Sequence, residues 1–147
     1  MEVLSLSTKQ TEELARKVAA ELKPGNILLL RGDLGSGKTT FTSFLVKALG
    51  IDARVQSPTF VIMRKYSGGT GDIKVVNHID LYRLTSIEEV EDLGLSEIVL
   101  ESDSITIVEW PDVASTFFSE IDTKNLIKID FEYQDEGVRK ITSSKRF

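Results

Sequence analysis

Residues 32–39 read Gly32-Asp33-Leu34-Gly35-Ser36-Gly37-Lys38-Thr39, a glycine-rich segment followed by lysine and threonine. It has the spacing G-x-x-x-x-G-K-[ST], in which glycines let the backbone curve around an anion with its N–H groups pointing inward. Lys38 is placed to reach the β- and γ-phosphates of a nucleotide, and the Thr39 hydroxyl is placed to ligate Mg²⁺. The stretch therefore predicts a nucleoside triphosphate site, most simply for ATP with Mg²⁺, formed by Asp33, Leu34, Gly35, Ser36, Gly37, Lys38, Thr39 and Thr40.

The segments on both sides of this stretch have the pattern that such a loop requires. Ile27–Leu30 is a short continuous apolar run, which is typical of a buried strand. Lys38–Leu49 places its apolar residues on one side and ends at Gly50, which indicates an amphipathic helix. The N-terminus of that helix would add its unpaired N–H groups and its dipole to the anion site.

The remaining elements indicate a sheet of mixed direction. A capping box at Ser7–Gln10 opens a helix that ends at Pro24-Gly25, and a second capping box at Ser86–Glu89 opens a short helix that ends at Gly94. Strands are expected at Phe60–Tyr66, Ile73–Ile79, Ile105–Val108, Leu126–Tyr133 and Val138–Ser143. The order of these elements predicts one domain, residues 1–147, with an α/β fold: a P-loop NTPase-like sandwich around a mixed central sheet.

Two carboxylates follow predicted strands and are candidates for the chemistry of the site. Glu109 comes directly after Ile105–Val108, and Asp80 comes directly after Ile73–Ile79. Ligands of open α/β sheets bind at the carboxyl ends of the strands, so both side chains are candidates to hold Mg²⁺ or to position water. Either one is equally compatible with an ordinary surface acid, because strands often end in Asp.

Composition narrows the class of protein. No apolar run approaches the roughly 20 residues that cross a bilayer, and the first residues lack the layout of a signal peptide, so we expect a cytoplasmic protein that does not enter the membrane. The absence of cysteine excludes thiol chemistry, and His78 is the only histidine. The net charge of −5 and the scattered basic residues indicate that any RNA would be held mainly by a partner.

Four segments occur together in this order: Gly32–Thr40, Ser57-Pro58-Thr59-Phe60, His78-Ile79-Asp80-Leu81-Tyr82-Arg83-Leu84 and Val108-Glu109-Trp110-Pro111. In these segments, and over nearly its whole length, the chain resembles a known family, the bacterial ATPases called TsaE or YjeE of tRNA threonylcarbamoyladenosine biosynthesis. The phosphate loop alone is generic, whereas the Ser-Pro-Thr-Phe and Asp-Leu-Tyr-Arg-Leu segments at these separations are specific to the family.

The resemblance implies an ATPase that supports turnover of a transferase complex made of TsaD-like and TsaB-like proteins, with tRNA contacted through that complex. It implies a metal site at Thr39 and Glu109, catalytic roles for Lys38 and Asp80, and a switch segment at Ser57–Phe60. Asp80 would position water or lie in the second shell of the metal. No arginine finger is evident in the motifs, so hydrolysis is expected to be slow alone and stimulated by partners.

Several residues keep two interpretations. Thr11 and Arg139 either border the adenine or are, respectively, a first-turn helix residue and an exposed hairpin residue. Trp110 either packs or presents a partner surface. Tyr82 and Arg83 either form a partner-facing patch, or Tyr82 packs while Arg83 pairs with Glu88, Glu89 or Glu91. His78 is expected to be packed or hydrogen-bonded.

Two other functions remain compatible with the same phosphate loop. A small-molecule kinase would need a lid with several arginines, and the stretch Ile87–Trp110 is poor in basic residues. A non-catalytic, nucleotide-gated binding module would not depend on Asp80 for its partner function.

Overall fold

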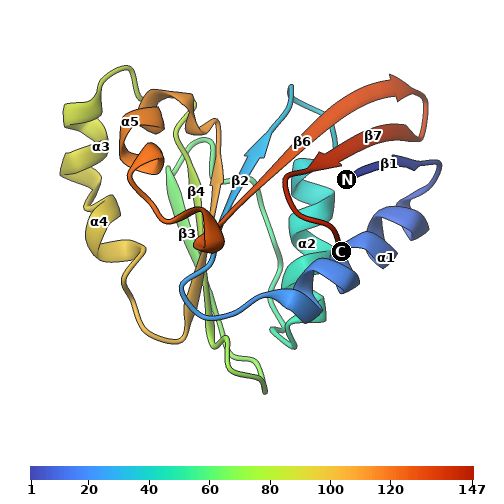
Figure 1. Ribbon diagram of the computed structural model, residues 1–147, viewed down its shortest axis with the longest axis horizontal. Helices are drawn as coiled ribbons and strands as arrows, with labels where there is room; N and C mark the ends of the chain where they lie inside the picture. The colour runs from blue at the N-terminus through green and yellow to red at the C-terminus, as the bar shows by residue number, and fades with distance from the viewer.

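The computed structural model describes residues 1–147 and has a seven-stranded sheet at its centre (Figure 1). Four central strands, β6, β2, β5 and β4, run parallel to one another, and the outer strands β1, β7 and β3 pair antiparallel with their neighbours. In spatial order the strands are β1 (Glu2–Ser5), β7 (Val138–Ser143), β6 (Leu126–Asp135), β2 (Ile27–Arg31), β5 (Ser104–Glu109), β4 (Val75–Asp80) and β3 (Met63–Ser67).

Helices cover both faces of the sheet and make three layers (Figure 1). On one side lie α1 (Thr8–Glu21) and α2 (Lys38–Ala48), which pack against each other. On the other side lie α3 (Ile87–Leu93), α4 (Leu95–Ile98), the 3₁₀ turn η1 (Pro111–Ala114) and α5 (Ser115–Ser119). A second 3₁₀ turn, η2 (Thr123–Asn125), leads into β6. The predicted fold class, an α/β sandwich with a mixed sheet, is confirmed.

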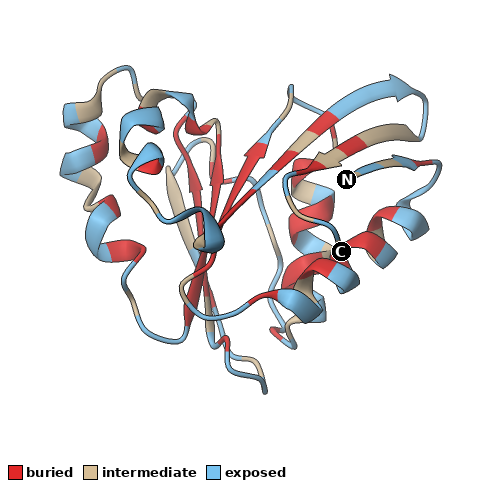
Figure 2. Ribbon diagram, in the orientation of Figure 1, coloured by how far each residue is buried: buried red, intermediate tan, exposed pale blue.

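Alternation along the strands divides the core into two clusters, one on each face of the sheet (Figure 2). In β2, Leu28 and Leu30 pack toward α1 and α2, whereas Ile27 and Leu29 pack toward the helices of the opposite face. All four side chains are buried, which explains why the sequence of β2 reads as a continuous apolar run.

The predicted helices begin where the sequence places their caps. The Ser7 hydroxyl accepts a hydrogen bond from the Gln10 amide, and the Ser86 hydroxyl accepts one from the Glu89 amide, both at 3.3 Å. Gly94 ends α3 in a left-handed conformation, as its position predicts. The longest helix, α1, has 14 residues, and none of the helices has the length and apolar composition to cross a bilayer.

The expected strand at Phe60–Tyr66 is wrong at its beginning, because β3 starts only at Met63. Residues 58–62 form a turn in which the Ile62 amide donates to the Pro58 carbonyl at 2.7 Å. Ile62 has φ 69°, a left-handed conformation that is strained for a β-branched residue. The turn is held by the Asp80 amide, which donates to the Ile62 carbonyl at 2.8 Å, a contact that local sequence does not reveal.

Three elements, β1, α4 and η2, were not predicted, and the strand that contains Asp80 has shifted bounds. β1 is a four-residue edge strand whose partner, β7, lies at the other end of the chain. α4 is a single turn that directly follows Gly94. The strand expected at Ile73–Ile79 runs instead from Val75 to Asp80, so that Asp80 is the last residue of β4 rather than the first residue after it.

Candidate active site

The glycine-rich loop joins the carboxyl end of β2 to the N-terminus of α2. Gly32 has φ 152°, and a Cβ atom there would lie 2.6 Å from both the Phe131 carbonyl oxygen and the Ser36 hydroxyl. Gly37 has φ 106° and precedes α2 without any side-chain cap, so the first amides of the helix remain available to an anion. Steric exclusion at Gly32 and backbone conformation at Gly37 therefore both require glycine.

Lys38 lies inside this loop, and its side chain is only 5% exposed. Its ammonium group donates to the Gly32 carbonyl, lies 4.0 Å from Glu109 Oε1 and lies 4.4 Å from the centre of the Trp110 ring. Burial lowers the pKa of Lys38, while the nearby carboxylates of Glu109 and Asp80 act in the opposite direction. The result is a cation held at the centre of the loop.

Asp80 and Glu109 are the last residues of two neighbouring parallel strands. They are direct partners in the register of β4 and β5, so their side chains lie on the same face of the sheet. This is the face that α2 covers. Asp80 accepts hydrogen bonds from the Thr59 hydroxyl at 2.7 Å and from the Tyr82 amide at 2.8 Å. Both carboxylates are buried, and these two hydrogen bonds fix the orientation of the Asp80 side chain.

Glu109 has a partner that sequence reasoning did not assign to the site. Its Oε2 atom lies 2.7 Å from His78 Nε2, and His78 Nδ1 lies 3.3 Å from the Tyr66 hydroxyl. His78 is fully buried and hydrogen-bonded, as expected of it, but the expectation did not include Glu109. Alternation along β4 carried a signal, because His78 lies two residues before Asp80 and therefore faces the same side of the sheet.

Most of these side chains line one pocket of about 170 Å³. The structure brings together Lys38, Asp80 and Glu109, which come from three separate elements. Among the residues predicted to bind nucleotide or metal, the pocket also contains Leu34, Gly35, Gly37, Thr39, Thr40 and Arg139.

Thr11 lines a smaller adjoining pocket of about 70 Å³ together with Gly37, Thr40 and Arg139. The Thr11 hydroxyl is already hydrogen-bonded to the Ser5 hydroxyl at 2.8 Å, so its local role in the helix and its place in the pocket coexist. Arg139 reaches across the loop from β7 and donates to the Gly35 carbonyl at 3.3 Å. Arg139 is therefore half-buried over the loop rather than simply exposed.

Two predicted nucleotide-binding residues do not line either pocket. The Asp33 carbonyl accepts a hydrogen bond from the Ser36 amide at 3.0 Å, which closes a turn within the loop. The Ser36 side chain points into the protein, where its hydroxyl is buried without a hydrogen-bond partner. The Asp33 carbonyl and the buried Ser36 side chain belong to the loop itself, and we expect any contact of these two residues with a phosphate to come from the backbone.

An apolar patch lies beside the pocket and consists of Phe60, Val61 and Tyr82, all of which are exposed. The Arg83 guanidinium stacks over the Phe60 ring at 4.5 Å and forms no ion pair, so of its two interpretations the pairing with Glu88, Glu89 or Glu91 is not observed. Tyr82 packs on Trp110 with ring centres 4.9 Å apart. Trp110 has φ 54°, a left-handed conformation that is uncommon for a bulky residue and that turns it toward Lys38.

With this geometry in place, comparison with known proteins gives a family. The family model described as threonylcarbamoyl adenosine biosynthesis protein TsaE matches residues 5–141. The chain belongs to the TsaE family. All of the pocket residues named above lie within the matched segment.

Relatives that carry the TsaE name come from several bacteria. The tRNA threonylcarbamoyladenosine biosynthesis protein TsaE of Bacillus subtilis is 42% identical over 72% of this chain and 63% of its own length. The Streptomyces coelicolor protein of the same name is 46% identical over 67% of this chain and 65% of its own length. The Rickettsia felis protein of that name is 36% identical over 89% of this chain and 72% of its own length. The first two matches thus span slightly less than two thirds of those relatives.

A solved structure supports the fold. The crystal structure of YdiB from Bacillus subtilis superposes with a TM-score of 0.75 and 29% sequence identity, and the match covers 97% of this chain and 83% of that one. The TsaE family and the P-loop NTPase-like fold therefore agree with the architecture seen here.

The oxygen donors of this TsaE-family site fit Mg²⁺ if water and the phosphates of a bound nucleotide supply the remaining ligands of the cation. Thr39, Asp80 and Glu109 supply a hydroxyl and two carboxylates, which are hard oxygen donors. No group of three or more His, Cys, Asp or Glu side chains is arranged to hold a metal. Mg²⁺ in such sites keeps several waters and takes other ligands from substrate phosphates, which matches this incomplete protein shell.

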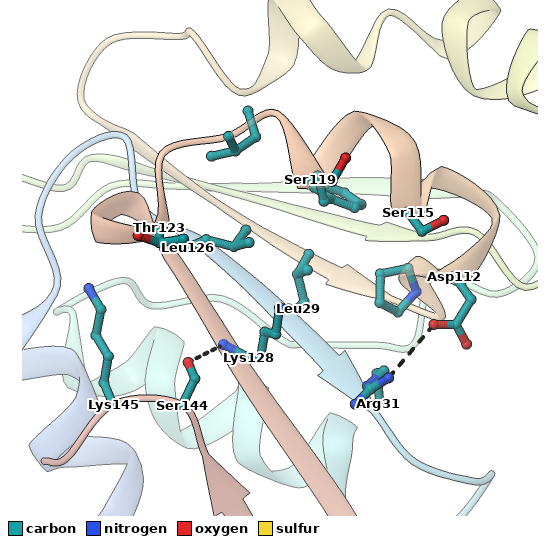
Figure 3. Close-up of a pocket in the computed structure, with 13 residues that line it drawn as sticks. Leu29, Arg31, Asp112, Ser115, Ser119, Thr123, Leu126, Lys128, Ser144 and Lys145 are labelled. Carbon is teal, nitrogen blue, oxygen red and sulfur yellow. Dashed lines mark hydrogen bonds and ion pairs between the residues drawn. The ribbon is translucent and has the colours of Figure 1, made fainter.

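A further pocket, of about 600 Å³, lies on the opposite face of the sheet and contains none of the predicted site residues (Figure 3). Its wall includes Arg31, the residue before the glycine loop, whose guanidinium binds Asp130 at 2.8 Å and lies 4.0 Å from Asp112. Hydrogen bonding with Asp130 raises the pKa of Arg31. The smaller pocket, not the larger one, holds the groups suited to phosphate chemistry.

Proposed function

We propose that this chain binds ATP with Mg²⁺ and hydrolyses it, as the ATPase component of the tRNA threonylcarbamoyladenosine machinery in the cytoplasm. The observation that carries the proposal is the convergence of Lys38, Asp80 and Glu109 in one pocket at the mouth of the glycine loop. Membership of the TsaE family supports the biological setting.

The chemistry proposed for this site is electrostatic. Loop amides and Lys38 would neutralise charge on the phosphoryl group as it transfers, in a partly buried site where such interactions are strong. Mg²⁺, when bound, supplies further positive charge, and Thr39 and Glu109 would hold it. Asp80 would orient the attacking water, because the Thr59 hydroxyl and the Tyr82 amide fix its carboxylate in place.

The base of the nucleotide is proposed to lie at the adjoining small pocket. Thr11 and Arg139 line that pocket next to Gly37 and Thr40, close to the start of α2. Arg139 packs against Gly37, where a Cβ atom would lie 3.5 Å from its Nε. Its guanidinium would therefore sit beside a nucleotide that enters along the loop, and Thr11 would border the adenine.

The direct test of this proposal is phosphate release from ATP by the purified chain. We expect slow release that requires Mg²⁺ and stops when a chelator removes the cation. Labelled γ-phosphate that moved to an added metabolite, with none released to water, would instead identify a small-molecule kinase. Tight Mg²⁺–ATP binding without release, alone or with partners, would identify a non-catalytic binding module.

Partner stimulation is proposed to act through the patch of Phe60, Val61 and Tyr82 beside the pocket. Exposed aromatic residues next to an arginine have the composition of interface hot spots. Thr59, the neighbour of Phe60, is hydrogen-bonded to Asp80, so contact with the patch would reach a residue proposed to act on water. The expected partners are TsaD-like and TsaB-like proteins, which would carry the tRNA contacts that this acidic chain lacks.

The Phe60→Ala variant should hydrolyse ATP alone at the wild-type rate but lose about 10-fold or more of the stimulation by TsaD-like and TsaB-like proteins. The measurement is the phosphate release rate as partner concentration increases. Leu100→Ala is the matched control, because Leu100 is equally exposed at 82%, against 79% for Phe60, but lies near the opposite ends of the strands. If the partners stimulated Phe60→Ala as strongly as Leu100→Ala, the patch would not be part of the partner interface.

A further inference from the structure

A chain of hydrogen bonds, buried at Glu109, His78 and Tyr66, runs from the proposed metal carboxylate to Gln56, the residue before the Ser57–Phe60 turn. Glu109 Oε2 lies 2.7 Å from His78 Nε2, and His78 Nδ1 lies 3.3 Å from the Tyr66 hydroxyl. The Tyr66 hydroxyl in turn contacts the carbonyl and the amide of Gln56 at 3.1 and 3.2 Å. His78 is fully buried, so no water competes for its contacts with Glu109 and Tyr66.

The direction of the first bond follows from its chemistry. An ionised carboxylate only accepts hydrogen bonds, so His78 Nε2 must carry the proton that points at Glu109. With Nε2 protonated, Nδ1 accepts a hydrogen bond from the Tyr66 hydroxyl, and the Gln56 amide donates to the same hydroxyl oxygen. Burial raises the pKa of Tyr66, which keeps that hydroxyl protonated. His78 therefore presents one fixed N–H group to one oxygen of Glu109.

This bond determines which oxygen of Glu109 faces the pocket. With Oε2 bound to His78, Oε1 is the atom that lies 4.0 Å from the Lys38 ammonium. Without the histidine, the carboxylate would be free to rotate or to pair fully with Lys38, and neither arrangement keeps an oxygen ready for a cation. Partners that orient a metal-binding carboxylate in this way commonly set the affinity of the site.

We propose that His78 is a positioning residue that holds Glu109 for Mg²⁺, with Tyr66 holding His78 in turn. The proposal rests on the proposed function, because it takes Glu109 as a ligand of the nucleotide-bound cation. The proposed function gives roles to the glycine loop and to the carboxylates at the strand ends but none to His78. This proposal adds one. The two carboxylates and the histidine then form one unit on neighbouring strands β4 and β5.

The test compares two amide substitutions that differ by one methylene group. In His78→Gln the side-chain amide nitrogen can occupy the position of Nε2 and donate to Glu109, whereas in His78→Asn it reaches only the position of Nδ1, on the Tyr66 side. Both variants place one polar amide in the same buried site, so they carry a similar cost for folding, which thermal melting checks. Trp110, the only tryptophan, lies next to Lys38 and reports binding by its fluorescence.

The measured quantity is the gain in affinity for a non-hydrolysable ATP analogue when Mg²⁺ replaces a chelator. We expect His78→Gln to keep most of the wild-type gain and His78→Asn to lose about 10- to 100-fold of it. Affinity in the chelator should be the same for both, because the loop is unchanged. If the His78→Asn variant does not fold, the Tyr66→Phe variant replaces it in the test. We expect Tyr66→Phe to reduce the Mg²⁺-dependent increase in affinity several-fold.

Two failures are distinguishable. A wild-type chain that shows no Mg²⁺-dependent gain would overturn the proposed metal site, and the role of His78 with it. A wild-type gain that His78→Asn or, in its place, Tyr66→Phe retains in full would overturn the positioning role alone. Because the readout is binding, the result does not depend on whether the chain hydrolyses ATP.

Discussion

Replacing Lys38 by alanine is expected to lower the rate of ATP hydrolysis by at least about 100-fold, the usual effect of removing one preorganised donor from a reacting centre. The Lys38 ammonium is the only cationic group buried in the pocket, and it already lies within the loop, bonded to the Gly32 carbonyl. No neighbour can take its place, because Arg139 approaches the loop from the side of β7. Single-turnover release of γ-phosphate measures the effect.

Lys47→Ala is the matched control for this substitution. Lys47 lies on the same helix, in the last turn of α2, and is exposed. We expect its removal to leave hydrolysis unchanged. A Lys38→Ala chain that hydrolysed ATP at the rate of Lys47→Ala would show that the glycine loop is not the reacting site.

Replacing Asp80 by asparagine is expected to lower kcat by about 10²- to 10⁴-fold while the affinity for Mg²⁺–ATP changes only a few-fold. Asparagine keeps an oxygen that can accept from the Thr59 hydroxyl or from the Tyr82 amide, so the turn should remain in place. What it removes is the negative charge that would orient the attacking water. Steady-state kinetics, together with Trp110 fluorescence for binding, separate the two effects.

Asp112→Asn provides the comparison for Asp80. Asp112 also follows a strand that ends at the site, but its side chain is 79% exposed and points to the opposite face, where it lies 4.0 Å from Arg31. We expect normal kcat and normal binding. If Asp80→Asn kept a normal kcat, the proposal that Asp80 positions water would be wrong. If the variant lost hydrolysis but still supported partner function, the proposal that hydrolysis is needed for that function would be wrong.

Much of the fold was predictable because it is encoded over short distances. The strand–loop–helix around Gly32–Thr39, the caps at Ser7 and Ser86 and the hairpin of β6 and β7 all depend on residues within a few positions of one another. The sequence failed where a distant partner overrides local preference. Phe60–Ile62 has the apolar character of a strand, but its backbone bonds to the Asp80 amide and forms a turn instead.

The sequence allowed us to predict which residues belong to the candidate site better than it allowed us to predict which residues contact one another there. Positions after apolar runs identified Asp80 and Glu109, because parallel strands bring their carboxyl ends to one edge of a sheet. Nothing local predicted that Arg139 would reach Gly35, 104 residues away, or that Ser36 would turn its hydroxyl into the protein. These depend on how β7 and the loop pack, not on spacing.

The glycine stretch Gly32–Thr39 and the patterns on either side of it were enough to predict a strand, a tight loop suited to an anion and a helix, since backbone conformation and helix start are local properties. The tertiary structure was needed to show that Asp80 and Glu109 are direct partners in register and that His78 Nε2 lies within hydrogen-bond distance of Glu109, 31 residues away. Strand order and register are set by burial of two apolar clusters on opposite faces of one sheet. That burial depends on the whole chain, so no single segment can specify it.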